Sequence, residues 1–201
     1  MFSLAACQQK NGWRDVLGGI TGNSSPNAYS GLESIVNGYV KAQGHVLTGE
    51  QFMIRALDLK SEEAKMVLEA RALTGTPTKS EIDESKTVVE NGNRALSEGM
   101  KLYAGKMSEV SKKAFRAGVI FLAKGLQEYI LMSKNAQGYR PNVSDVAHCI
   151  TSVLTIVPSL PDSITSLTAT LNATIQFMKS NDILPPEKNV TEGLPGFWFY
   201  L

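Results

Sequence analysis

The sequence predicts an all-α protein, a single-domain bundle of six or seven helices with an extended aromatic C-terminal tail. Three observations support this fold class. Helix-capping sequences recur along the chain, and the apolar residues between them are spaced three and four positions apart. No stretch of convincing length alternates apolar and polar residues as a half-buried strand does. With 201 residues, 43% of them hydrophobic, the chain can fill one core.

The first part of the domain is expected to form three helices. Apolar spacing predicts a helix over about 31–43, which would end at Gly44. A capping box that begins at Thr48 predicts a second helix, and Ser61, followed by two glutamates, precedes a third along residues 66–73. The alternative is that the second and third form one bent helix. The face of the first helix consists of Leu32, Ile35, Val36, Tyr39 and Val40.

The proline-free stretch 79–134 is too long for one helix in a domain of this size, so two helices are expected. A capping box at Thr78 begins the stretch, and Gly105 followed by Ser108 marks the break. Heptad spacing before and across the break predicts a buried seam, Ile82, Val89, Leu96, Met100, Tyr103, Met107 and Val110. The second helix packs larger residues on one side, Phe115, Val119, Leu122, Leu126 and Tyr129. It also carries small residues that would let another helix approach closely, Ala114, Gly118 and Gly125.

Two more helices are predicted, over about 144–156 and about 162–180, separated by the start signal Ser159-Leu160-Pro161-Asp162. The chain then ends in an aromatic tail, Phe197-Trp198-Phe199-Tyr200. Consecutive large apolar side chains left in water would form a sticky patch. We therefore expect the tail to dock on its own helices, and the alternative is that it docks on a protein partner.

Composition and spacing argue against several classes of function. A net charge of +1 argues against nucleic acid as a partner. The two cysteines and two histidines have no metal-ligand spacing, so no metal or cofactor is expected. Neighbouring residues of a helix point about 100° apart, which makes His148 and Cys149 structural residues rather than a catalytic pair. His45, after the expected helix end at Gly44, is predicted to be a capping or surface residue. We expect no catalytic residues and no enzyme activity.

The N-terminus carries the most specific motif. Leu4-Ala5-Ala6-Cys7 resembles the lipobox of bacterial lipoproteins, in which a leucine and two small residues precede a cysteine that receives lipid. The resemblance implies a signal-peptide remnant over 1–6, a lipid on Cys7, and an all-α domain over 30–201. Residues 7–29 would then contain the lipid attachment site and a tether rich in glycine, serine and asparagine. Gln8, where aspartate would imply inner-membrane retention, implies the outer membrane, with the domain facing the periplasm.

The expected function is a non-enzymatic role in binding or envelope assembly, with a membrane contact through Cys7 and a protein partner of the cell envelope. The aromatic tail is one candidate interaction site. A basic stretch that includes Lys112, Lys113 and Arg116 is another, either a solvated helix face or a contact for anionic head groups, lipopolysaccharide or an acidic protein. Two alternatives remain, a cytosolic all-α adaptor that starts at Met1, and a lipid or cell-wall hydrolase with an unrecognised site.

Overall fold

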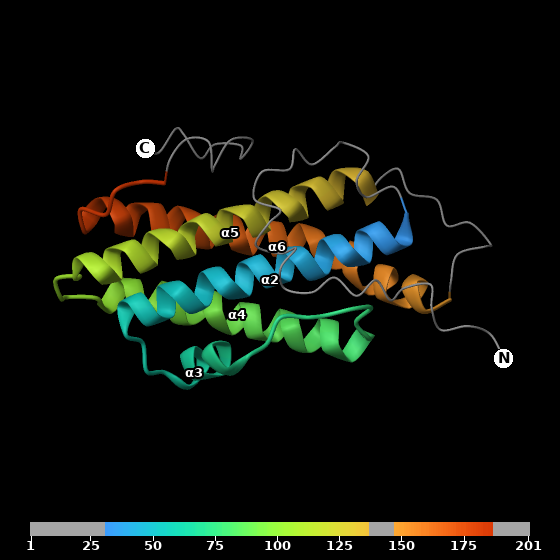
Figure 1. Ribbon diagram of the computed structural model, residues 1–201, viewed down its shortest axis with the longest axis horizontal. Coiled ribbons are helices and arrows are strands. Elements are labelled where there is room, and N and C mark those ends of the chain that lie inside the picture. The colour runs from blue at the N-terminus through green and yellow to red at the C-terminus, as the bar shows by residue number, and fades with distance from the viewer. Residues whose placement is uncertain (1–30, 137–146, 187–201) are drawn as a thin grey trace.

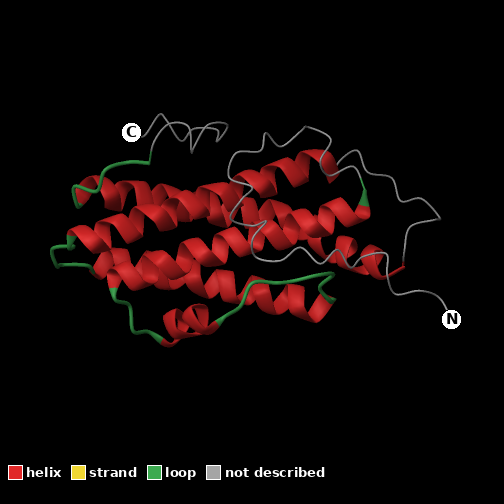
Figure 2. Ribbon diagram, viewed as in Figure 1, coloured by secondary structure: helices red, strands yellow, loops and turns green. Residues whose placement is uncertain are grey.

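The computed structural model describes residues 31–136 and 147–186, and within these ranges the chain forms five helices. They are α2 (Leu32–Leu57), α3 (Glu62–Glu69), α4 (Lys79–Leu102), α5 (Glu109–Ala136) and α6 (Ala147–Ser180). The four long helices lie side by side in an elongated bundle, and the short α3 packs on its outside against α4 and α2 (Figure 1). The described part of the chain contains no strand (Figure 2), which confirms the all-α prediction.

The described ranges hold fewer helices than the six or seven predicted, and one reason is that α2 does not end at Gly44. Thr48 does not cap a new helix, because its hydroxyl donates a hydrogen bond back to the Gly44 carbonyl at 2.7 Å within α2. Val46 and Met53 continue the buried stripe of the helix past this point. A glycine inside a helix costs only about 1 kcal/mol, so burial of the continuous stripe outweighs it. α2 ends instead at Leu57, and the separate helix α3 follows Ser61, whose side chain caps it.

The second reason is that α6 runs without interruption through Pro158 and Pro161, where we predicted a break. Ile156 and Leu160 are buried on the stripe that continues to Leu167 along the same helix. Each internal proline loses one backbone hydrogen bond and costs about 3 kcal/mol. Packing of the unbroken stripe against the bundle outweighs that cost, as tertiary contacts often override local propensity.

The start signals of α4 and α5 are confirmed. Thr78 caps α4 by accepting from the Glu81 backbone N–H, while the Glu81 carboxylate accepts from the Thr78 N–H at 2.7 Å. Ser108 accepts from the backbone N–H of Ser111 at 3.1 Å. α4 ends at Leu102 and α5 begins at Glu109, so the predicted break lies where Gly105 and Ser108 indicated it.

α2 and α5 pack more closely than any other described pair, because glycines replace side chains at their crossing. A Cβ at Gly49 would lie 2.7 Å from the Gly118 carbonyl oxygen and 2.8 Å from the Leu122 backbone nitrogen. A Cβ at Gly118 would lie 2.6 Å from the Gly49 oxygen, and one at Gly125 would lie 2.5 Å from a methyl of Val46. The small strip predicted on α5 is therefore the surface against which α2 packs.

α4 and α6 are joined by a polar contact inside the bundle. Asn93 donates to the Ser166 hydroxyl at 3.1 Å, and the Thr170 hydroxyl donates to the Asn93 side-chain oxygen at 2.7 Å. Asn93 and Thr170 are both buried. Because a buried polar group left without a partner is costly, these bonds fix the register between the two helices.

The predicted heptad seam holds within α4 but not across the break. Ile82 and Leu96 have no exposed surface, whereas Val110 is 79% exposed. The connection between α4 and α5 restarts the helix, so the heptad phase of α4 does not extend to Val110. Met107, within the connection, remains buried.

Leu96→Ala is expected to lower the free energy of unfolding by roughly 2–4 kcal/mol, since it leaves a cavity at a fully buried position. Chemical denaturation followed by circular dichroism measures this change. Leu102→Ala, in the same helix but 82% exposed, is the matched control and should change stability by less than about 0.5 kcal/mol. Equal effects of the two variants would contradict the placement of Leu96 in the core.

Candidate functional site

Several residues singled out in the sequence fall beyond the structural description. Outside the described residues lie Cys7, Phe197, Trp198, Phe199 and Tyr200. His148 and Cys149 belong to the first turn of α6, but their side chains are likewise outside the description. Their predicted roles therefore stay predictions.

The three basic residues predicted as one patch occupy different environments on α5. Lys112 is 22% exposed and forms an ion pair with Glu109, with Nζ and Oε1 3.3 Å apart. Arg116 is half-buried, and its Nε has no hydrogen-bond partner among the described residues. Lys113 is exposed. Of the three, Lys113 offers the most accessible charge to a partner.

The end of the bundle formed by residues 101–113, here called the α4–α5 tip, carries an unusual surface. Leu102 is 82% exposed and Val110 is 79% exposed, more than any other large hydrophobic residue of the described ranges. Lys101, Lys106 and Lys113 are exposed beside them. The tip thus combines two protruding aliphatic side chains with three accessible lysines.

The tip is attached to the bundle by aromatic packing. The Tyr103 ring meets the Phe177 ring of α6 edge-on, with the ring centroids 5.6 Å apart. The centroid of the Phe177 ring lies 5.1 Å from that of the Phe115 ring of α5. Met107 is buried between these elements and the core. The α4–α5 connection and the C-terminal end of α6 therefore lie at the same end of the molecule (Figure 1). The protruding side chains are carried by an anchored backbone.

Sequence reasoning missed Leu102 and placed Val110 inside. A signal for Leu102 was present, because it directly precedes the seam residue Tyr103 and neighbouring helix residues point about 100° apart. Val110 carried no such signal, since its place in the heptad depended on a helix that does not continue through the connection.

A second unusual feature is the carboxyl of Glu50, which is completely buried between α2 and α4. It lies directly against Gly92, where any side chain would collide with it. Neither carboxyl oxygen has a hydrogen-bond partner among the described residues. Burial alone raises the pKa of Glu50 well above the ordinary value, because the charged form loses its hydration. Loss of the proton from this carboxyl would therefore lower the stability of the folded protein.

The core of the bundle also holds two buried tyrosines, of which Tyr129 is close enough to Glu50 to feel its charge. The Gln43 amide donates to the Tyr39 hydroxyl at 2.8 Å, and the rings of Tyr39 and Tyr129 lie 6.0 Å apart. Burial raises the pKa of Tyr39 to about 12, and burial followed by the charges of Tyr39 and Glu50 raises the pKa of Tyr129. Both tyrosines therefore keep their protons at ordinary pH.

His45 does not cap a helix end, contrary to one of the two predicted roles, because α2 continues past it, and the residue is half-buried. Its ring packs 6.0 Å from the Phe121 ring of α5. Burial, and then the positive charge of Lys41, lower its pKa from 6.5 to about 4. His45 is thus a neutral packing residue at ordinary pH.

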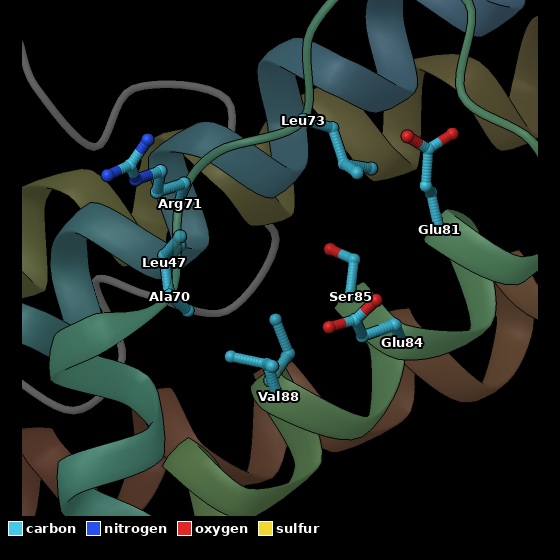
Figure 3. Close-up of a pocket in the computed structure, with 9 residues that line it drawn as sticks. Leu47, Ala70, Arg71, Leu73, Glu81, Glu84, Ser85 and Val88 are labelled. Carbon is cyan, nitrogen blue, oxygen red and sulfur yellow. The ribbon is translucent and has the colours of Figure 1, made fainter.

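The described residues also enclose a shallow hollow of about 210 Å³ between α2, α4 and the segment that follows α3 (Figure 3). Its lining residues are Leu47, Ala70, Arg71, Leu73, Glu81, Glu84, Ser85, Val88 and Val89. The Arg71 guanidinium points away from the hollow (Figure 3), and the Glu81 carboxylate is engaged in the cap of α4. Its charged groups do not converge on one point, as a catalytic site would require.

Within the described ranges, no three histidine, cysteine, aspartate or glutamate side chains gather closely enough to hold a metal ion. None of the helices described above combines the length and the apolar character needed to cross a bilayer. Comparison with protein-family models, with curated proteins and with solved structures finds no match.

Proposed function

We propose that this chain is a lipid-anchored protein of the bacterial outer membrane, with its helical domain in the periplasm and a non-enzymatic role in binding or envelope assembly. The observation that carries the proposal is the lipobox-like sequence Leu4-Ala5-Ala6-Cys7. About 25 residues rich in glycine, serine and asparagine separate Cys7 from the start of α2 at Leu32. This order, lipid site, tether-like composition and then a folded domain, is typical of an anchored protein.

The described surface supports a role in binding. Leu102 and Val110 are the most exposed large hydrophobic residues of the described ranges, and both belong to the α4–α5 tip, so this end of the domain is the candidate contact surface. The anchored backbone of the α4–α5 tip would present them without the cost of ordering a loop. The aromatic tail over 197–200 is proposed as a second contact, either with the chain's own helices or with an envelope protein.

Cys7 is expected to carry lipid when the gene is expressed in its host with its native upstream region. Mass spectrometry of the mature N-terminal peptide should show an acylated cysteine as the first residue. Cys7→Ser, expressed in the same way, should leave an N-terminus that is neither acylated nor processed. An unmodified peptide that continues through Cys7 in the wild-type protein would end the proposal.

A further inference from the structure

We propose that the α4–α5 tip binds the surface of a bilayer that contains anionic lipids. Its lysines would contact the head-group phosphates, while Leu102 and Val110 would enter the boundary between head groups and acyl chains. This inference rests on the proposed function, because it assigns a membrane-facing end to a domain that is tethered to the same membrane.

The apolar part of the argument is the shape of the tip. Leu102 and Val110 flank the connection and protrude from it at 82% and 79% exposure. A protein partner would need a matching cavity for each of them. A bilayer interface accepts protruding aliphatic groups of any arrangement, since binding there scales with the buried apolar area. The geometry therefore favours a lipid surface over a shaped protein surface.

The charged part of the argument is the excess of free lysines. Lys101, Lys106 and Lys113 are exposed at the tip, and Lys112 is paired with the acid of the tip, Glu109. Further charged residues near this end of the bundle are Arg55 in the last turn of α2, Asp58 and Lys60, which pair with each other, and Glu98, Lys179 and Asp182. Lysines beside a negatively charged leaflet each add to its attraction, and their long stems can lie along the aliphatic groups.

The tether allows this orientation. α2 begins at Leu32, at the opposite end of the bundle from the tip (Figure 1). The 26 residues of α2 span about 39 Å at ~1.5 Å per residue. The segment of about 25 residues from Cys7 to Leu32 can reach at most about 85 Å at ~3.4 Å per residue. An anchor at Cys7 therefore does not prevent the far end of the domain from touching the same membrane.

The test uses the full chain with Cys7→Ser, which removes lipidation, in a vesicle co-sedimentation assay. We expect binding to vesicles of phosphatidylcholine with about one third phosphatidylglycerol, and little binding to pure phosphatidylcholine. The combined change Lys101→Gln, Lys106→Gln and Lys113→Gln should weaken binding at least tenfold, and high salt should do the same. Leu102→Ser with Val110→Ser should also weaken it at least tenfold.

Matched variants separate the tip from general effects. Lys65→Gln, Lys86→Gln and Lys134→Gln make the same charge change away from the tip, and Leu154→Ser removes another exposed leucine. These controls should bind like the Cys7→Ser chain, and thermal unfolding verifies that every variant is folded.

Three outcomes would overturn the inference. They are equal binding to neutral and anionic vesicles, equal losses in tip and control variants, and no vesicle binding at all. If Cys7 is acylated in the host but the Cys7→Ser chain does not bind vesicles, the lipoprotein proposal stands. The tip is then either a contact for a protein or a surface without a binding role. Vesicle binding through the tip together with an unacylated Cys7 would leave a peripheral membrane protein and end the lipoprotein proposal.

Discussion

Gly49→Ala is expected to destabilise the protein by about 4 kcal/mol or more, beyond the ~1–3 kcal/mol typical of overpacking. The new methyl group would lie 2.7 Å from the Gly118 carbonyl oxygen and 2.8 Å from the Leu122 nitrogen. Both are backbone atoms, so no side chain can rotate away, and α2 and α5 must separate. Urea denaturation followed by circular dichroism measures the loss.

Gly44→Ala is the control in the same helix and should have the opposite sign. The nearest atom to its new methyl group would be the Ala72 Cβ at 3.8 Å, which is ordinary van der Waals contact. Replacing a glycine inside a helix by alanine stabilises by about 0.5–1 kcal/mol when nothing collides. Similar destabilisation by both substitutions would show that helix propensity, and not the α2–α5 contact, governs this region.

Glu50→Gln is expected to stabilise the protein at pH 7–8 and to remove much of its dependence on pH. The amide has the shape of the carboxyl and keeps the contact with Gly92, but it never ionises. Because burial raises the pKa of Glu50 in the folded state, its contribution to stability is fully present below the ordinary pKa of 4.5 and is lost as the pH rises. The loss is about 1.4 kcal/mol per pH unit until the folded-state pKa is reached.

His45 also has a shifted pKa, but it does not affect this comparison. Its pKa falls from 6.5 to about 4 on folding, so it destabilises the protein only as the pH drops below 6.5. Both proteins carry His45, so its contribution cancels in the difference between them. The stability difference between Glu50→Gln and the wild type should widen as the pH rises above 4.5, and two parallel curves would contradict the burial of a protonated carboxyl.

The sequence predicts best those parts of the fold that local chemistry decides. Thr78 with Glu81, and Ser108 before α5, bind the free N–H groups of their own helices, so the break between α4 and α5 follows from nearby residues. The continuity of α6 through Pro158 does not follow from nearby residues. It depends on the packing of Ile156 and Leu160 against helices that are distant in the sequence. α2 passes Gly44 for the same reason. Predicted breaks that tertiary packing overrides account for the smaller number of helices within residues 31–136 and 147–186.

The candidate sites were less accessible to sequence reasoning. Glu50 could have been found, since it lies four residues after Val46 and three before Met53 on an apolar stripe, where a charged residue is unusual. The contact between Glu50 and Gly92 could not have been predicted, because Gly92 belongs to another helix. The exposure of Val110 depends on how the connection after Leu102 turns, which the heptad pattern does not encode.

The glycine contact between α2 and α5 has a consequence for how the protein is made. α2 is complete once Leu57 has been synthesised, but its partner begins only at Glu109, about 50 residues later. At ~5–20 residues per second this is a delay of about 3 to 10 seconds. During that time α3 and α4 are available to α2, but the face around Gly49 and Met53 lacks the helix that covers it in the folded protein, and these contacts are non-local and slow to form. A nascent chain of this sequence would be an early client for chaperones that shield apolar segments.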